Sequence, residues 1–299
     1  MSSVSRTSAL VTAVLLLGLL PSAGTVGAAA SSPCVRPTIV GTSAGEVLRG
    51  TPGPDRIVGL GGDDTILGRG GRDRICAGRG ADVVRGGADR DELFGQGGTD
   101  QLFGGVGRDF LIGDAGADRI FGGADRDRLG GVGGNDLLYG GTGRDWAGYF
   151  LASDSIVANL KSGVVTGEGR DRLVGIESVY GSPQDDLLIG NSANNTLRGE
   201  NGSDRVLGGT GRDVVVGGRG DDLLRGGPGA DLVDDSLDQA PGVSPDTGLD
   251  RLFGGPGRDR LDAVDLIRRN DFLNGGSDRD RCRADLGDRL VSCRRATSS

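Results

Sequence analysis

The sequence predicts an all-β protein, a parallel coil (β-solenoid) of nine-residue repeats arranged in two main runs. Three observations predict this fold. Gly supplies 60 of the 299 residues, far above its usual share of about 7%. The glycines recur with a period of nine, and an aspartate and an aliphatic residue follow them at fixed positions. This period excludes a helix, and it excludes collagen, which needs Gly at every third residue.

The repeat units define a turn followed by a short strand. Twelve units follow one another without a register slip over residues 41–148, and six more cover residues 181–234. In the eleven units from Gly50 onward, position 6 is always Asp, position 8 is Ile, Val or Leu in ten, and position 4 is Gly in nine and Asp in two. Gly and Asp tolerate the left-handed backbone region, which indicates a turn at position 4. Six turn residues and a three-residue strand are expected in each unit.

Positions 6 and 8 lie two residues apart, so they face the same side of an extended strand. The aspartate and the aliphatic residue are therefore both expected to point inward. Two units make one coil of 18 residues, which stacks the position-6 carboxylates in two columns, one at each edge. Asp55, Asp73, Asp91, Asp109, Asp127 and Asp145 would form one column, and Glu46, Asp64, Asp82, Asp100, Asp118 and Asp136 the other.

Stacked carboxylates repel one another unless a cation lies between them. Calcium takes six to eight oxygen ligands with flexible geometry, which carboxylates and turn carbonyls can supply, whereas magnesium requires a tighter octahedron. Five gaps in each column of the first run predict up to ten Ca²⁺ ions there, and the second run could add four.

A known family shares this pattern. The units match G-G-x-G-x-D-x-U-x, and over residues 41–292, with interruptions, the chain resembles the bacterial, secreted RTX (haemolysin-type) calcium-binding proteins. The resemblance implies a right-handed parallel β-roll with Ca²⁺ held between successive turns by the position-6 carboxylates. Residues 146–190 also resemble a recurrent RTX interruption through the sequences LVGIE and GSPQDD. Asn195 replaces the expected Asp, and Gln184 and Ala193 occupy position 4, which weakens the sites they would form.

The calcium ligands that the resemblance implies are the position-6 aspartates of both runs and of two weaker units beyond them. They are Asp55, Asp64, Asp73, Asp82, Asp91, Asp100, Asp109, Asp118, Asp127, Asp136, Asp145, Asp186, Asp204, Asp213, Asp222, Asp231, Asp250 and Asp259.

The start of the chain predicts export. Arg6 precedes an apolar run from Ala9 to Leu20, and small residues follow up to Ala30, as in a cleaved secretory signal. The apolar run is shorter than the roughly 20 residues that span a membrane. We therefore expect an extracellular protein, released or held at the cell surface. The predicted organisation is a signal peptide (1–30), N-terminal cap (31–40), first β-roll (41–148), interrupting β segment (149–180), second β-roll (181–234), polar insert (235–244) and degenerate repeats with a C-terminal cap (245–292).

Four cysteines in an exported chain suggest two disulfides. Proximity along the sequence favours Cys34–Cys76 and Cys282–Cys293, although four cysteines allow three pairings. Each of the favoured bonds would tie down one end of the repeat array.

Composition excludes several function classes. The chain has no His, so it can form neither a Ser-His-Asp triad nor a His-ligated zinc site. Its net charge of −8 disfavours nucleic acid and anionic membranes as partners. Paired carboxylates recur in every coil, whereas a catalytic pair is unique. The sequence thus predicts a calcium-binding folding or spacing module that is not an enzyme. The alternative is an accessory or adhesin-like module serving an extracellular enzyme or a surface matrix.

Two surface features leave alternatives open. Arginines at positions 5 and 7, such as Arg72 and Arg108, alternate with aspartates and are expected to form a solvated, charge-balanced face. Trp146, Tyr149 and Phe150 follow the last unit of the first run. Since the ends of solenoids must be covered, these aromatic residues are expected to form a hydrophobic plug, with a sugar-binding platform as the alternative.

Overall fold

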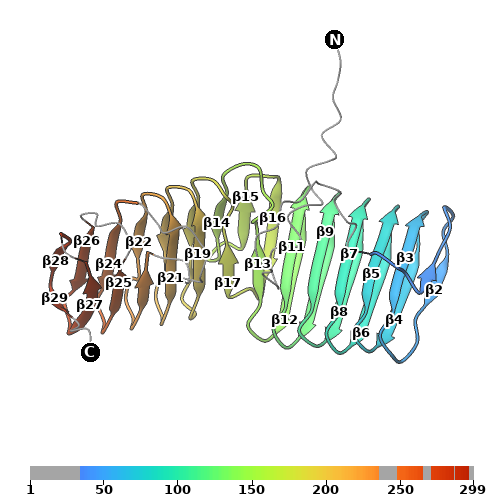
Figure 1. Cartoon of the computed structure of the whole chain (residues 1–299), viewed down its shortest axis with the longest axis horizontal. Coiled ribbons are helices and arrows are strands. Elements are labelled where there is room, and N and C mark those ends of the chain that lie inside the picture. The colour runs from blue at the N-terminus through green and yellow to red at the C-terminus, as the bar shows by residue number, and fades with distance from the viewer. Residues whose placement is uncertain (1–33, 236–247, 265–270, 286, 296–299) are drawn as a thin grey trace, which may run out of the picture.

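A computed structural model describes residues 34–235, 248–264, 271–285 and 287–295. These residues form strands and turns, and the described part of the chain contains no helix. The strands form two long sheets, here called sheet A and sheet B, in a stack of coils that runs the length of the molecule (Figure 1). The predicted signal peptide and the predicted polar insert, apart from Asp235, lie outside the described residues.

Sheet A has 14 strands, and all its neighbouring strands are parallel. In spatial order they are β1 (Ile39–Val40), β3 (Arg56–Gly61), β5 (Arg74–Arg79), β7 (Glu92–Gly97), β9 (Phe110–Ala115), β11 (Arg128–Gly133), β13 (Trp146–Gly148), β17 (Ser178–Tyr180), β19 (Thr196–Asn201), β21 (Val214–Arg219), β23 (Leu232–Asp234), β25 (Arg260–Ala263), β27 (Asp280–Ala284) and β29 (Cys293–Arg295).

Sheet B has 15 strands. In spatial order they are β2 (Val47–Arg49), β4 (Thr65–Gly70), β6 (Val83–Ala88), β8 (Gln101–Val106), β10 (Arg119–Ala124), β12 (Leu137–Thr142), β16 (Arg170–Val174), β15 (Val164–Thr166), β14 (Val157–Asn159), β18 (Leu187–Ile189), β20 (Arg205–Leu207), β22 (Leu223–Arg225), β24 (Arg251–Gly255), β26 (Phe272–Gly276) and β28 (Arg289–Val291).

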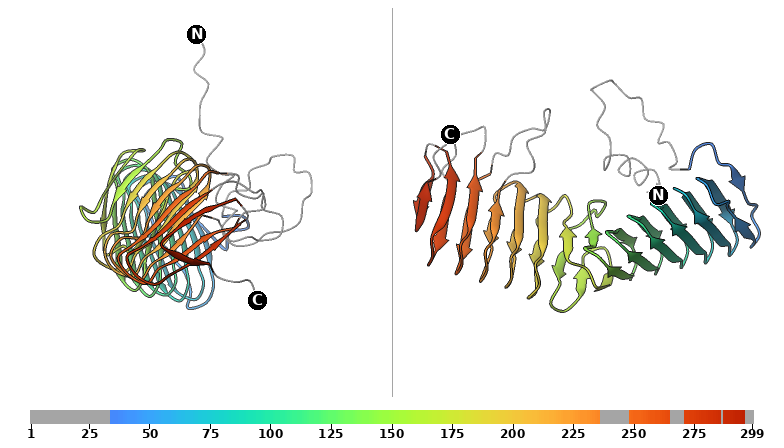
Figure 2. Two further views of the ribbon diagram at one scale, coloured as in Figure 1. Left: turned by 90° about the vertical axis from the view of Figure 1, so that its left-hand side faces the viewer. Right: turned by 90° about the horizontal axis from the view of Figure 1, so that it is seen from below.

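The strand register confirms the predicted β-roll. Ile57 pairs with Ile75, and Ile75 with Leu93, so equivalent residues of successive coils are 18 apart. Consecutive repeat units contribute strands to opposite sheets, which gives two units per coil. Viewed along the long axis, the coils lie one behind another (Figure 2).

The core consists of the position-8 aliphatic side chains of both sheets. Ile57, Leu93 and Leu111 from sheet A and Leu102 and Ile120 from sheet B are fully buried, and they belong to one continuous apolar cluster. Most residues at positions 7 and 9 are half-buried or exposed, as in the alternating pattern of β3. The predicted inward direction of position 8 is therefore confirmed.

The strands of the regular units are longer than predicted. They have six residues and extend from position 7 of one unit to position 3 of the next, as in β3 and β5. Backbone pairing continues through Leu60 and Gly61 although Leu60 has a φ of 78°. Position 4 also has a positive φ, for Gly62 (88°) and for Asp89 (75°), which confirms the turn predicted there. The longer strand was not predicted because glycines, which are typical of turns, occupy positions 1 to 3.

The segment between the two runs interrupts one sheet only. In sheet A, β13 pairs directly with β17, in parallel. In sheet B, β15 lies between β16 and β14 and is antiparallel to both. The strand β16 pairs with β12 as an ordinary coil would, so the segment contains repeat-like structure as well as an insertion.

The array does not end at Trp146, so the predicted hydrophobic plug is wrong. Tyr149 is buried inside the solenoid. Trp146 lies on the outer face, where its ring centroid is 4.7 Å from that of Tyr180. The guanidinium carbon of Arg128 lies 4.9 Å from the Trp146 ring centroid. Because sheet A continues past this point, there is no open end for these side chains to cover.

Both favoured disulfides are present. Cys34 is bonded to Cys76 on β5, and Cys282 on β27 is bonded to Cys293 on β29. The first bond packs with Phe94 and Ile112 in a small apolar cluster on the outside of sheet A. The predicted pairing is confirmed, and each bond lies near one end of the described solenoid.

Candidate metal centre

The predicted ligands lie where a turn leads into a strand. Asp73, for example, directly precedes β5 of sheet A, and Asp82 precedes β6 of sheet B. All eighteen are buried, with exposed fractions of 0 to 6%. The aspartate directly precedes the outward-facing position 7, so it shares the inward direction of position 8, as predicted.

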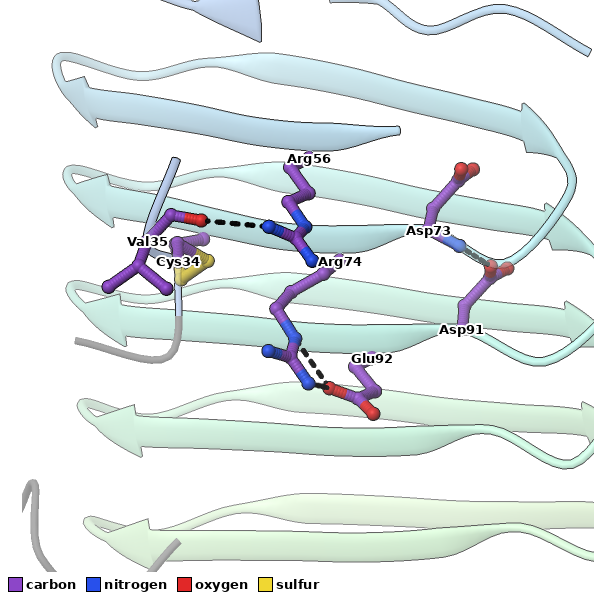
Figure 3. Close-up of polar contacts among 8 residues, drawn as sticks. Cys34, Val35, Arg56, Asp73, Arg74, Asp91 and Glu92 are labelled. Carbon is purple, nitrogen blue, oxygen red and sulfur yellow. Dashed lines mark hydrogen bonds and ion pairs between the residues drawn. A yellow bond between two sulfur atoms is a disulfide. The ribbon is translucent and has the colours of Figure 1, made fainter. Parts of the chain in front are cut away.

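Backbone hydrogen bonds join the carboxylates into columns. The N–H of Asp73 donates to Oδ1 of Asp91 at 2.9 Å, as Figure 3 shows, and the N–H of Asp91 donates to Oδ1 of Asp109 at 2.8 Å. The same bond links Asp82 to Asp100 and Asp100 to Asp118 along sheet B. Each side chain thus reaches back to the preceding coil, and the two columns are those expected from the sequence.

In fifteen of the column aspartates the second carboxylate oxygen, Oδ2, has no hydrogen-bond partner among the described residues. A buried polar atom without a partner is costly and marks a place where a ligand or ion belongs. These oxygens belong to Asp64, Asp73, Asp82, Asp91, Asp100, Asp109, Asp118, Asp127, Asp136, Asp145, Asp204, Asp213, Asp231, Asp259 and Asp280. Buried, anionic, oxygen-only donors repeated along both edges suit a hard divalent cation, and Ca²⁺ in particular.

The first aspartate of each run differs from those in the interior. Oδ2 of Asp55 accepts hydrogen bonds from the N–H and the hydroxyl of Thr51, at 2.6 and 3.0 Å. Asp186 is capped in the same way by Ser182, whose N–H donates to Oδ2 at 2.6 Å. A hydroxyl residue at position 2 therefore supplies partners that the interior aspartates lack, so Asp55 and Asp186 have less need of a cation.

Burial raises the pKa of the column aspartates. The pKa of Asp91 rises from 3.8 to about 7, chiefly through burial, although the hydrogen bond from the N–H of Asp73 lowers it; the charges of Asp109 and Asp73 raise it further. The pKa of Asp100 also rises to about 7 for the same reasons, with Asp118 and Asp82 as the neighbouring charges. Without a cation, these carboxyl groups therefore resist ionisation at neutral pH.

We expect acid to favour the folded state of the metal-free chain. The folded pKa of Asp91, Asp100 and Asp127 is about 7, against about 3.9 in an unfolded chain. Between these values the folded state binds more protons, so its stability is fully present below about pH 4 and is lost as the pH rises through about 7. Circular dichroism of chain freed of metal by chelating resin should show more β-structure at pH 5 than at pH 7.5.

Calcium should invert this dependence, because protons and Ca²⁺ compete for the same oxygens. In saturating calcium, the midpoint of thermal unfolding should fall as the pH is lowered from 7.5 to 5. Metal-free chain whose β-structure is unchanged or smaller at pH 5 would contradict the assignment of buried, cation-free carboxylates.

The columns continue into the interrupting segment through two residues that the sequence analysis did not select. The N–H of Asp136 donates to Oδ1 of Asp171 at 2.9 Å, and the N–H of Asp145 donates to Oε2 of Glu177 at 2.9 Å. Oδ2 of Asp171 accepts a hydrogen bond from the hydroxyl of Tyr149 at 2.9 Å. The signal for Asp171 was present in the sequence, because residues 169–173 match positions 4 to 8 of the repeat.

Asn195 stands in the place of a column aspartate, but its side-chain oxygen accepts a hydrogen bond from its own turn and not from the preceding coil. Its side chain is fully buried, its Oδ1 accepts the N–H of Asn191 at 2.8 Å, and its own N–H donates to Oδ1 of Asp213 at 2.8 Å. Its Nδ2 donates to the carbonyl oxygen of Glu177 in the preceding coil at 3.2 Å, so an amide fits this place without the negative charge.

The degenerate C-terminal units also extend both columns. The N–H of Asp231 donates to Asp259, and that of Asp259 to Asp280, at 2.9 Å each. In the other column Asp250 donates to Asp271 at 2.8 Å. Asp235, assigned to the polar insert by the sequence, is instead buried close to Asp250 and Asp271, and one carboxylate oxygen from each lies within 4.8 Å of the others. Glycine usually occupies the place of Asp235 in the repeat, so the pattern gave no signal for it.

The comparison with protein families agrees with this geometry. A family model described as the RTX calcium-binding nonapeptide repeat matches residues 40–75, 77–111, 94–129, 103–138, 112–147, 180–215, 207–234, 246–263 and 268–291. A comparison with curated proteins finds no match. Within the described residues, no helix has the length and apolar character needed to cross a membrane.

Proposed function

Because the chain belongs to the RTX calcium-binding nonapeptide-repeat proteins, we propose that it is an exported, non-catalytic β-roll whose folding is completed by Ca²⁺ bound between its stacked turns. The observation that carries this proposal is the row of buried Oδ2 atoms without partners in both columns. Each such oxygen belongs to a carboxylate whose other oxygen is already held by the preceding coil, as in Asp100.

The interior aspartates are the residues that would hold the ions, together with carbonyl oxygens of the turns. A bound ion would supply the positive charge that stacked carboxylates require. The protein contributes the rest: the N–H bonds fix the direction of each carboxylate, and the close packing of the coils excludes water. Preorganised donors of this kind reduce the entropy that binding must otherwise overcome.

The regularity of the columns supports a non-catalytic role. Asp91, Asp100 and Asp109 have the same burial and the same hydrogen bonds. A catalytic carboxylate pair is distinguished from its surroundings by environment and separation, whereas these residues are interchangeable. Export is supported by the signal-like N-terminal sequence and by the two disulfides, which persist in oxidising compartments.

Asp100→Asn tests the role of the interior carboxylates. The amide keeps an oxygen that can accept the N–H of Asp82, but it removes the charge from two adjacent ion sites. We expect the midpoint of a calcium titration, followed by circular dichroism, to move to higher concentration. The calcium-loaded stability should fall by more than about 2 kcal/mol, as expected when a metal ligand is lost.

Two variants serve as controls. Thr99→Ala changes an exposed residue next to Asp100 and should leave the midpoint unchanged. Asp55→Asn should shift it less than Asp100→Asn, because Thr51 already satisfies Oδ2 of Asp55. Equal midpoints for Asp100→Asn and Thr99→Ala would refute the proposed ion sites.

A further inference from the structure

One edge of the first roll carries an arginine in five successive coils. Arg72, Arg90, Arg108, Arg126 and Arg144, here called the arginine ladder, occupy position 5, directly before the sheet A column of aspartates, and all are exposed. They are 18 residues apart and therefore lie on neighbouring coils, about 4.8 Å from one to the next. The ladder is a row of like charges along the outside of the solenoid.

Direct ion pairs do not neutralise this row. The sequence predicted a charge-balanced face, but the neighbouring aspartates at position 6 are buried and point inward, away from the arginines. Arg72, Arg90, Arg108 and Arg126 make no hydrogen bond or ion pair with another described residue. The other residues of these turns are mainly Gly, Ala, Thr and Val, and their exposed acidic residues are Asp89 and Asp125.

The opposite edge shows that the repeat does not require arginine here. Its position-5 residues, before the sheet B column, are Asp63, Ala81, Thr99, Ala117 and Asn135. The two edges have the same backbone and the same buried aspartates but differ in surface charge. The basic edge is thus a property of this sequence and is independent of the calcium pattern.

The same edge is basic and concave in the second roll. Arg212, Arg258 and Arg279 occupy position 5 of the equivalent turns, and with Arg260 and Arg281 they line a cleft of about 610 Å³. Ala230 stands at position 5 between Arg212 and Arg258, which leaves room between their side chains. Two separate parts of one edge therefore present guanidinium groups to solvent.

We propose that the arginine ladder binds a linear acidic polysaccharide through its sulfate or carboxylate groups. Guanidinium groups form bidentate, charge-assisted hydrogen bonds with such oxyanions. A row of evenly spaced arginines suits a polymer with repeating charges, and one pyranose ring is close in length to the rise of one coil. The turns of this edge contain no aromatic residue on which a nucleic-acid base could stack, which favours a polysaccharide over single-stranded DNA.

The test uses the full exported chain in saturating calcium, with circular dichroism to verify folding. Isothermal titration calorimetry would measure binding of a dextran sulfate hexasaccharide, of a hyaluronan hexasaccharide, which carries carboxylates, and of unsulfated dextran as the blank. We expect at least one of the two acidic probes to bind, with an affinity that falls as salt is added. Arg90→Ala combined with Arg108→Ala should weaken binding by about tenfold or more.

The matched control is Ala81→Glu combined with Ala117→Glu. Both residues are exposed at position 5 of the opposite edge, and both pairs change the net charge of the chain by the same amount. The control should keep the affinity within about twofold, since its charges lie on the far edge and are screened. The proposal would be overturned if neither acidic hexasaccharide bound the folded chain, or if both double variants lost the same affinity. It would also be overturned if single-stranded DNA bound the folded chain as tightly as the hexasaccharides. If the chain folds without calcium, the proposed function is refuted, whereas the arginine ladder is still tested by the same calorimetric titration.

Discussion

At neutral pH, removal of calcium is expected to abolish most of the β-structure of the exported chain, and its return should restore that structure cooperatively. Each nine-residue unit buries one aliphatic side chain, such as Leu102, together with one carboxylate, such as Asp100, which burial makes hard to ionise. Neighbouring coils support one another through their hydrogen-bonded columns, so the transition should involve many units together. Extracellular calcium modules bind at about 10⁻⁴–10⁻³ M, and we expect the midpoint in this range.

Circular dichroism during a calcium titration would measure this transition, with magnesium at the same concentration as the control. Magnesium should restore little structure, because it keeps its waters and demands octahedral geometry. A full β-sheet spectrum in excess chelator at pH 7.5 would show that the coils are stable alone and that calcium is an accessory ligand.

Gly116→Ala is expected to prevent folding of the central coils even in saturating calcium. Gly116 stands at position 4 with a φ of 148°, and a Cβ there would lie 1.5 Å from the carbonyl oxygen of Gly98 in the preceding coil. Because the obstacle is backbone at the stacking distance, relief requires the coils to separate. We expect a loss of about 4 kcal/mol or more, at the upper end of single substitutions.

Gly53→Ala is the matched control, because Gly53 occupies the same repeat position in the first complete unit. A Cβ there would have Thr51 Oγ1 as its nearest neighbour, at 3.8 Å, and no other atom of the described residues lies within 4 Å of it. Its thermal unfolding midpoint in calcium should equal that of the parent chain, while that of Gly116→Ala should be far lower. Similar midpoints for the two variants would mean that the coils stack less closely than described.

The sequence predicted the fold and the columns because each depends on a strict period. Asp at position 6 and an aliphatic residue at position 8 determine the register of every regular coil, and Ile57 and Ile75 pair as that period requires. Departures from the period were harder to predict. The second half of each strand was not predicted, because the glycines at positions 1 to 3 are typical of turns. Asp235 was not predicted as a ligand, because it stands where the repeat usually has glycine.

Contacts that depend on the geometry of a turn or on the direction of a side chain were also not predicted from the sequence. The caps on Asp55 and Asp186 come from Thr51 and Ser182, four residues earlier, and only the turn geometry brings the hydroxyls to the carboxylates. The separation of the arginine ladder from the buried aspartates likewise depends on the direction of each side chain. Residues of opposite charge that are adjacent in the sequence, such as Arg108 and Asp109, therefore lie in different environments: the arginine is exposed and the aspartate is buried.

The insertion confined to sheet B gives the solenoid a permanent bend. From β11 to β17, sheet A advances by two strand spacings, through β13, whereas from β12 to β18, in the same coils, sheet B advances by four, through β16, β15 and β14. The two extra strands, β15 and β14, act as a wedge that lengthens one side of the stack by about 10 Å. The row of strands changes direction at this point (Figure 2). The solenoid is consequently bent, with sheet B on its longer, convex side. The edges of the two rolls therefore run in different directions.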